Sequence, residues 1–166
     1  MKKDKDSFLK VLEQHQKIIF KVCNAYCHDP EERKDLVQEV IIQLWKSFNR
    51  YDEQYKITTW MYRIALNVAI SFYRKESRRK GKSYALDERL ILIAHEDRQD
   101  NEENLKLLEQ FINQLDPLNR ALMILYLDEN SHEEIASILE ISVSNVGTKI
   151  NRIKQKLRKQ FETLEK

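Results

Sequence analysis

Glycine and proline are scarce in this sequence, which has only two of each among its 166 residues. Tight turns between β-strands depend on such residues, whereas helices need neither of them. Hydrophobic residues make up 42% of the chain and charged residues 34%, so the chain can bury a core. The composition therefore predicts an all-α fold, arranged as one ordinary domain or two small ones.

Long apolar runs are absent as well. No run approaches the ~20 consecutive residues that a membrane-spanning helix requires. The first ten residues, MKKDKDSFLK, carry charge and lack the apolar segment of a secretory signal. We therefore expect a cytoplasmic protein with no membrane insertion.

Features of catalytic and metal sites are also missing. The sequence has no nucleotide-binding glycine loop and no recognisable nucleophile–base pair, so we expect neither an enzyme nor a cofactor. Cys23 and Cys27 lie four residues apart on a predicted helix, with His15 and His28 nearby. Their spacing matches no common zinc signature. We expect buried or idle reduced thiols and no metal, with zinc binding as the alternative.

Charge is unevenly distributed along a chain whose formal net charge is only +2. Residues 74–82 carry six bases against one acid, residues 95–104 are mostly acidic, and residues 142–159 carry six bases and no acid. Segregated basic stretches are typical of nucleic-acid-binding proteins. The alternative is that these runs are merely solvated helix faces.

The apolar spacing predicts three helices in a first domain, residues 5–80. Each proline follows an aspartate, so helices should begin near Pro30 and Pro117, with Asp29 and Asp116 as N-caps. Glu32 stands where a capping box would place it. The third helix should run from about residue 59 to 79. Its expected inner face comprises Trp60, Ile64, Ala65, Val68, Phe72 and Tyr73.

Residues 81–104 show no sustained period and are interpreted as a linker, followed by a second helical domain at residues 105–162. Ser131 and Glu134 form a capping-box pattern that opens a short helix, and Ser142 is a plausible N-cap for the long basic helix after it. This pattern predicts a helix-turn-helix. The expected inward residues are Ile135, Ala136, Leu139, Ile141, Val146, Ile150, Ile153 and Leu157.

The opposite side of the basic helix carries side chains suited to base edges and phosphates. They are Ser144, Asn145, Thr148, Lys149 and Arg152, with Lys154, Lys156, Arg158 and Lys159 extending the charge. Glu140 occupies a turn position that often holds a left-handed glycine, which costs a non-glycine residue about 1–2 kcal/mol. Gly147 has two open explanations: close approach to a DNA groove wall, or close packing on the preceding helix.

Two stretches of the first domain, DLVQEVIIQLWKSF and TTWMYRIALNVAISFYRK, stand before this helix-turn-helix. In this order they resemble bacterial RNA polymerase sigma factors of the extracytoplasmic-function (ECF) group of the sigma-70 family. Residues 10–80 look like the second region of the family and residues 106–160 like the fourth. The region that joins them in larger sigma factors has only the linker in its place.

The resemblance implies three sites. Asp35, Gln38 and Glu39, with Trp45 near the same surface, would bind core polymerase; the alternative is an ordinary solvated face with Trp45 in the core. The third helix would bind and melt the −10 element, although the family often has Asp where this chain has Ser71. The matching residues on the −10 side are Thr58, Thr59, Trp60, Tyr62, Arg63, Asn67, Arg74, Arg78 and Arg79, with the Trp60 ring expected to be largely buried. Those on the −35 side are Ser144, Asn145, Thr148, Lys149, Arg152 and Lys154.

The sequence thus predicts a sigma factor that joins core RNA polymerase, reads two promoter DNA elements and helps to open the duplex. An inhibitory anti-sigma factor is a further partner that the resemblance implies. One alternative is a stand-alone helix-turn-helix regulator that acts without polymerase. Another is a helical interaction protein, such as an anti-sigma factor or adaptor, which would leave the basic helix unexplained.

Overall fold

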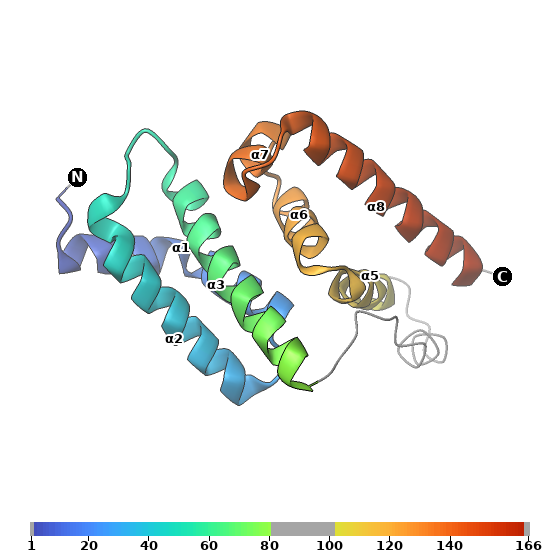
Figure 1. Ribbon diagram of the computed structural model, residues 1–166, viewed down its shortest axis with the longest axis horizontal. Helices are drawn as coiled ribbons and strands as arrows, with labels where there is room; N and C mark the ends of the chain where they lie inside the picture. Colours follow the sequence, from blue (N-terminus) through green and yellow to red (C-terminus); the bar gives the residue numbers. More distant parts are fainter. Residues whose placement is uncertain (1, 81–101, 165–166) are drawn as a thin grey trace. The chain divides into compact units, whose positions relative to one another are not determined.

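The computed structural model describes residues 2–80 and 102–164, and every regular element in these ranges is a helix (Figure 1). The all-α prediction is therefore confirmed. Most of the predicted linker, residues 81–101, lies outside the described residues. No helix within the described ranges is long and apolar enough to span a membrane. The chain divides into two compact units, one built on the helices before the linker and the other on most of those after it.

The first unit contains α1 (Lys5–Tyr26), α2 (Pro30–Ser47), a 3-10 turn (Phe48–Arg50) and α3 (Ile57–Lys80). The start of α2 is the predicted one: Pro30 is the first helical residue, and the Asp29 carboxylate accepts the backbone N–H groups of Glu31 and Glu32. Each of the three helices packs against the other two. Their shared core includes Val22, Cys23, Leu36, Val40, Leu44, Met61, Ala65 and Ala69.

The inner face of α3 differs from the predicted one. Its buried residues are Thr59, Met61, Tyr62, Ala65, Leu66 and Ala69. Of the predicted set only Ala65 is buried, while Ile64, Val68 and Phe72 line a groove of about 680 Å³ between α2 and α3. Both rows repeat every three or four residues, so the period could not decide between them. The row that is buried carries Ala65 and Ala69, whose small side chains allow α3 to lie close to its neighbours.

The second unit contains α5 (Glu102–Gln114), α6 (Pro117–Leu127), α7 (His132–Leu139) and α8 (Val143–Leu164). Helix α6 begins at the predicted proline, and the Asp116 carboxylate accepts the backbone N–H of Asn119 at 2.8 Å. One part of the core joins α5, α6 and α8 through Phe111, Ile112, Met123 and Ile153. Ile135, Val146 and Ile150 are buried as predicted, and so is Ile138, which the sequence analysis missed.

Arg120 of α6 is an unexpected member of this core, with only 1% of its surface exposed. Its guanidinium donates hydrogen bonds to the backbone carbonyl oxygens of Asn113 and Leu115, at 2.6 and 3.2 Å. These carbonyls lie at the end of α5, where the last C=O groups of a helix have no partner within it. Arg120 therefore caps α5 from inside the unit.

Cys23 and Cys27 are both buried in the first unit, as expected. Burial raises the pKa of the Cys23 thiol to about 12, so this group stays protonated at neutral pH. A protonated, enclosed thiol is a poor nucleophile and a poor metal ligand. The two cysteines therefore act as small apolar packing groups.

Candidate protein- and DNA-binding surfaces

Helices α7 and α8 form the predicted helix-turn-helix. At the start of α7 the Ser131 hydroxyl accepts the Glu134 N–H, and the Glu134 carboxylate accepts the Ser131 N–H, both at 3.1 Å. This reciprocal pair is the predicted capping box. The Ser142 hydroxyl in turn accepts the Asn145 N–H at 3.1 Å and caps α8.

The turn between these helices has the left-handed residue that the sequence indicated. Glu140 has a φ of 57°, and the Ile141 N–H donates to the Ala136 carbonyl at 3.2 Å. A left-handed residue followed by this bond is the usual way to end a helix, although glycine is the usual residue. The capped ends on either side hold the backbone in this conformation despite the cost to a non-glycine residue.

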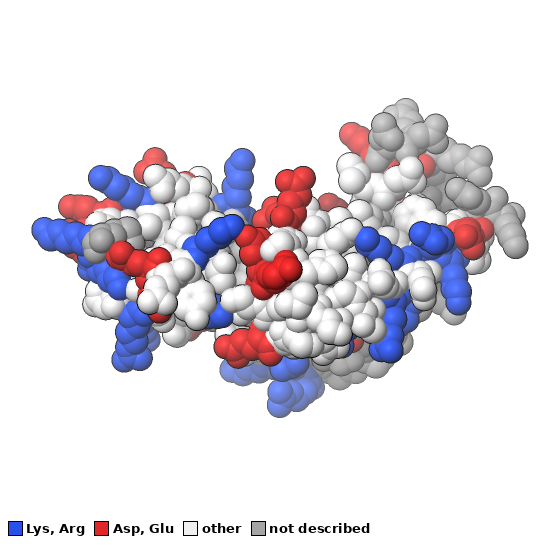
Figure 2. All heavy atoms as spheres, turned by 90° about the horizontal axis from the view of Figure 1, so that it is seen from above, with Lys and Arg blue, Asp and Glu red and all other residues white. Residues whose placement is uncertain are grey.

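The buried stripe of α8, Val146–Ile150–Ile153, fixes which side of the helix faces solvent. We call the solvent side the reading face and define it as Ser144, Asn145, Thr148, Lys149 and Arg152. All of these residues are exposed except Lys149, which is half-buried. Figure 2 shows one group of lysine and arginine side chains toward the right, where α8 runs in Figure 1, and other groups toward the left.

Lys154 does not lie on the reading face. Two residues along an α-helix turn by about 200°, so Lys154 points away from Arg152. Its ammonium nitrogen lies 4.4 Å from the centre of the Tyr126 ring and donates to the Tyr126 hydroxyl. The DNA contact that its charge suggested would have to form from the side of α8 that faces away from Arg152, and it stays a prediction.

Gly147 is not required by packing inside the second unit. A Cβ atom at this position would lie 3.8 Å from the nearest atom of His132, which is an ordinary contact distance. Close packing on α7 therefore does not explain the glycine. Close approach to a DNA groove wall, the other explanation left open by the sequence, stays a prediction.

On α2, five residues form one exposed face opposite the buried Leu36, Val40 and Leu44. We call it the α2 surface; it comprises Asp35, Gln38, Glu39, Ile42 and Trp45. Ile42 and Trp45 are 44% and 46% exposed, although both are strongly apolar. The Trp45 ring packs on Phe8 at 5.0 Å between centroids, so it is neither wholly in the core nor wholly solvated.

Ile42 was missed by the sequence analysis, which sought polar residues on this helix. The signal was present, because Ile41 and Ile42 are adjacent and cannot both face the same core. An exposed isoleucine beside an exposed tryptophan is an apolar patch with polar neighbours, which is typical of a protein-binding site.

The predicted DNA-binding residues of α3 fall into two classes. Asn67, Arg74, Arg78 and Arg79 are exposed, whereas Thr59 and Tyr62 are 6% and 2% exposed. Thr59 and Tyr62 therefore offer little surface to DNA in this structure, and the contacts predicted for them stay predictions. Thr58 and Arg63 are half-buried. Trp60 is half-buried too, with its ring 5.2 Å from that of Tyr51 and 6.0 Å from that of Phe48.

The loop before α3 adds an aromatic residue that the sequence analysis did not single out. Tyr55 is 47% exposed, and the Arg63 guanidinium lies 5.2 Å from the centre of its ring. The Tyr51 hydroxyl donates to the Tyr55 carbonyl and holds the loop. An exposed ring with a guanidinium over it is a surface on which a nucleic-acid base can stack.

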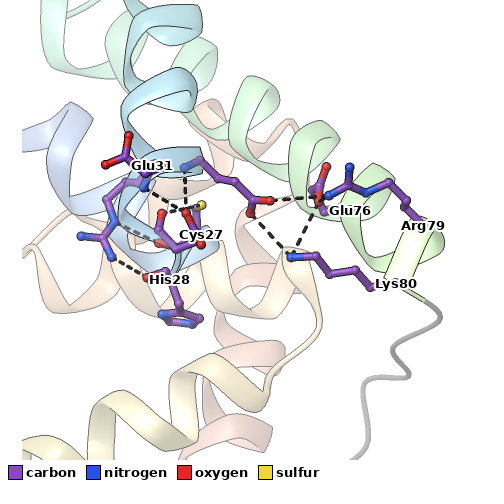
Figure 3. Close-up of polar contacts among 9 residues, drawn as sticks. Cys27, His28, Glu31, Glu76, Arg79 and Lys80 are labelled. Atoms are coloured by element: carbon purple, nitrogen blue, oxygen red, sulfur yellow. Dashed lines mark hydrogen bonds and ion pairs between the residues drawn. The ribbon is translucent and has the colours of Figure 1, made fainter.

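The end of α3 is joined to the start of α2 by four charged side chains, which we call the charged clasp: Glu32, Glu76, Arg79 and Lys80 (Figure 3). The Arg79 guanidinium lies 2.7 Å from the Glu76 carboxylate and 3.5 Å from that of Glu32. The Lys80 ammonium lies 3.6 and 3.8 Å from the carboxylates of Glu32 and Glu76. Arg79, predicted to bind DNA on the −10 side, is therefore already engaged by two acids.

Comparison with known proteins places both units in one family. The family model described as Sigma-70 region 2 matches residues 11–79, and the one described as Sigma-70, region 4 matches residues 105–157. The ECF RNA polymerase sigma factor SigW of Bacillus subtilis is 32% identical over 98% of this chain and 93% of its own length. The ECF RNA polymerase sigma-E factor of Haemophilus influenzae is 24% identical over 97% and 90%.

Two solved structures share the fold. CnrH in complex with the cytosolic domain of CnrY matches 96% of this chain and 90% of that one, with a TM-score of 0.69 and 19% identity. The sigma factor RpoE of Bartonella quintana, crystallised with the anti-sigma factor NepR, matches 95% and 96%, with a TM-score of 0.68 and 19% identity. At this level of identity the likeness concerns the fold alone.

Proposed function

Because this chain belongs to the ECF group of the sigma-70 family, it is a sigma factor that directs RNA polymerase to promoters, and we propose which of its surfaces perform each step. The observation that carries the proposal is the capped helix-turn-helix with an exposed reading face, in the same chain as the exposed, partly apolar α2 surface. Binding to DNA and to polymerase is a regulatory role without catalysis. We place the protein in the cytoplasm, where core polymerase acts.

The α2 surface is the proposed binding site for core polymerase. Ile42 and Trp45 supply apolar area that loses water when a partner covers it, and Asp35, Gln38 and Glu39 supply polar groups around that area. An apolar centre with a polar rim is the usual arrangement of a protein–protein interface. The Glu39 carboxylate accepts a hydrogen bond from the Gln43 amide at 2.8 Å, which holds one rim group in place.

The −10 element is proposed to bind along α3 and the loop before it. Separating a base from its stack costs a few kcal/mol, which the protein must offset by giving the base a new stacking partner. Stacking on an aromatic ring is worth about 1–3 kcal/mol per base. Tyr55, supported by Arg63, and the partly exposed Trp60 are the rings available, while Asn67, Arg74 and Arg78 are exposed to contact the strand.

The −35 element is proposed to bind the reading face of α8. An α-helix fits the major groove of B-form DNA, and residues near its N-terminus reach the base edges. Asn145 and Thr148 are suited to bases, and Lys149 and Arg152 to bases or phosphates. Gly147 would let the helix backbone approach the groove wall. The domain limits follow these roles: residues 5–80 serve polymerase and the −10 element, and residues 105–162 serve the −35 element.

An anti-sigma factor is a proposed further partner. Two structural relatives were solved with such proteins or domains bound, although their identity to this chain is only 19%. The α2 surface offers apolar area that an inhibitor could cover to block polymerase binding.

In-vitro transcription tests the proposed function directly. We expect the purified chain, added to bacterial core polymerase, to give initiation at specific promoters, and we expect the purified chain alone to bind duplex DNA only weakly. A chain that fails to bind polymerase but binds one duplex sequence tightly would instead be a stand-alone regulator.

Replacing Lys149 and Arg152 by Ala should weaken promoter binding by the holoenzyme. A lost base contact should cost roughly 1–3 kcal/mol and relax specificity at one position, whereas a lost phosphate contact should weaken all sequences alike. Competition binding with promoter variants at several salt concentrations separates these effects. Lys154→Ala is the matched control, because it removes a cation from the same helix on the side held by Tyr126. Equal losses in both variants would show that the wrong side of α8 is assigned to DNA.

A further inference from the structure

We propose that the charged clasp restrains DNA binding: Glu32 and Glu76 cancel the attraction of Arg79 and Lys80 for the phosphate backbone and so suppress non-specific binding. The inference rests on the proposed function in one respect, namely that the end of α3 lies near DNA. It adds a role for Glu32, which the sequence pattern assigned only to a capping box, and for Glu76, which the proposed contacts do not use.

The geometry of the clasp separates the basic run into two sets. Arg74 and Arg78 are one turn apart and share a face of α3, on which both are exposed. Arg79 and Lys80 follow Arg78 by about 100° and 200° around the helix, which turns them toward the start of α2. There each cation meets both acids, one from its own helix and one from α2.

The burial of the clasp shows that its cations remain within reach of a ligand. The Arg79 side chain is 64% exposed and that of Lys80 is 39% exposed, whereas the Glu76 side chain is only 19% exposed. Exposed ion pairs contribute little to folding stability, because water and salt screen them. Folding stability therefore explains the clasp poorly. Neutralising the positive charge at the end of α3 explains it better.

The clasp is also held in position by its surroundings. The Asp29 carboxylate caps α2 just before Glu32, and the Arg33 guanidinium donates to the carbonyls of Cys27 and His28 at 3.0 Å each. Figure 3 shows these contacts beside the clasp. Because the start of α2 is fixed in this way, the Glu32 carboxylate is kept beside the end of α3 instead of moving into solvent.

The consequence for DNA binding can be estimated from counterion release. Each phosphate contact steepens the dependence of the binding constant on salt by about 0.9 on a log–log scale. If Arg79 and Lys80 are released, two contacts are gained, and the slope should steepen by about 1.8. The gain in the DNA-binding constant over wild type should therefore shrink by roughly tenfold when salt is raised from 50 to 200 mM. The clasp should therefore reduce DNA affinity most at low salt, where non-specific binding is strongest.

The test is fluorescence anisotropy of the full chain with one labelled duplex of arbitrary sequence, titrated at several salt concentrations. Glu32→Gln with Glu76→Gln should bind about tenfold more tightly than wild type near 50 mM salt, with the steeper slope given above, and little more tightly near 200 mM. Glu13→Gln with Glu109→Gln is the control, since it makes the same change in net charge at exposed positions on α1 and α5.

A third variant combines Glu32→Gln and Glu76→Gln with Arg79→Gln and Lys80→Gln, and it should bind like wild type. Three results would each overturn the inference. The first is an unchanged affinity and slope in the two-glutamate variant, and the second is an equal gain in affinity in the control. The third is a gain in affinity that survives in the four-residue variant. The absence of measurable binding by every variant would overturn it as well. Arg74→Gln with Arg78→Gln tests the proposed function separately: if this loss of charge leaves binding unchanged, it is the placement of α3 on DNA that fails.

Discussion

Arg120→Ala is expected to unfold the second unit while leaving the first intact. The substitution removes two donors from buried backbone carbonyls and leaves a cavity where a side chain 1% exposed had packed. An unsatisfied buried polar group costs about 1–3 kcal/mol, and a large-to-small core substitution costs about 2–5 kcal/mol. Because small domains are stable by only about 5–15 kcal/mol, a loss of this size is decisive for so small a unit.

The chain provides its own probe for this experiment. Its two tryptophans, Trp45 and Trp60, both lie in the first unit. In the variant, circular dichroism should show an early loss of helix on heating, while tryptophan fluorescence should keep the wild-type transition. Arg120→Met fills most of the space without donors, and so measures the hydrogen bonds apart from the cavity.

Arg158→Ala is the matched control, since it removes an exposed arginine from α8 in the same unit. Exposed substitutions of this kind usually alter stability by under about 0.5 kcal/mol. If Arg120→Ala melts like Arg158→Ala by both probes, the guanidinium is not what holds α5 to α6.

Local signals in the sequence predicted the helix ends well, because their physics is local. The prolines and aspartates at the starts of α2 and α6, the Ser131–Glu134 box and the Ser142 cap act within four residues of their partners. Glu140 was placed correctly in the left-handed region for the same reason, since the lengths of the two flanking helices leave only a short turn.

Features that depend on distant parts of the chain were less accessible. Arg120 resembles any arginine on a helix until α5 is folded beside it, because its partners are backbone carbonyls that no sequence pattern marks. The inner face of α3 was ambiguous, since two rows of apolar residues share the same period. The groove between α2 and α3 keeps Ile64, Val68 and Phe72 partly exposed.

The candidate sites show the same difference between local features, which the sequence predicts, and features that depend on distant parts of the chain. The reading face followed from the position of Val146, Ile150 and Ile153, because an apolar stripe on a helix fixes its opposite side. Lys154 and Arg79 were assigned to DNA because they are basic, and the structure gives each a partner within its own unit. Charge in a sequence indicates where positive residues are, but tertiary structure decides which of them are available.

Replacing Gln38 and Glu39 together by Ala should abolish promoter-specific transcription by preventing polymerase binding. Both side chains are exposed on the α2 surface, opposite Leu36 and Val40, so their truncation leaves no cavity. Residues that anchor an interface commonly cost 2 kcal/mol or more on truncation. A loss of about 2 kcal/mol weakens binding roughly 30-fold.

The measurement is a titration of core polymerase with each variant beside a thermal melt. Glu13→Ala with Gln14→Ala is the matched control, because it removes the same two residue types from exposed positions on α1. Lost polymerase binding with an unchanged melt, seen in the α2 variant and absent from the control, identifies α2 as the docking helix. Full transcription by the α2 variant would exclude Gln38 and Glu39 from the interface. Asp35, Ile42 and Trp45 would then be the part of the α2 surface left to account for polymerase binding, because they are the exposed groups of that face which the double variant leaves in place.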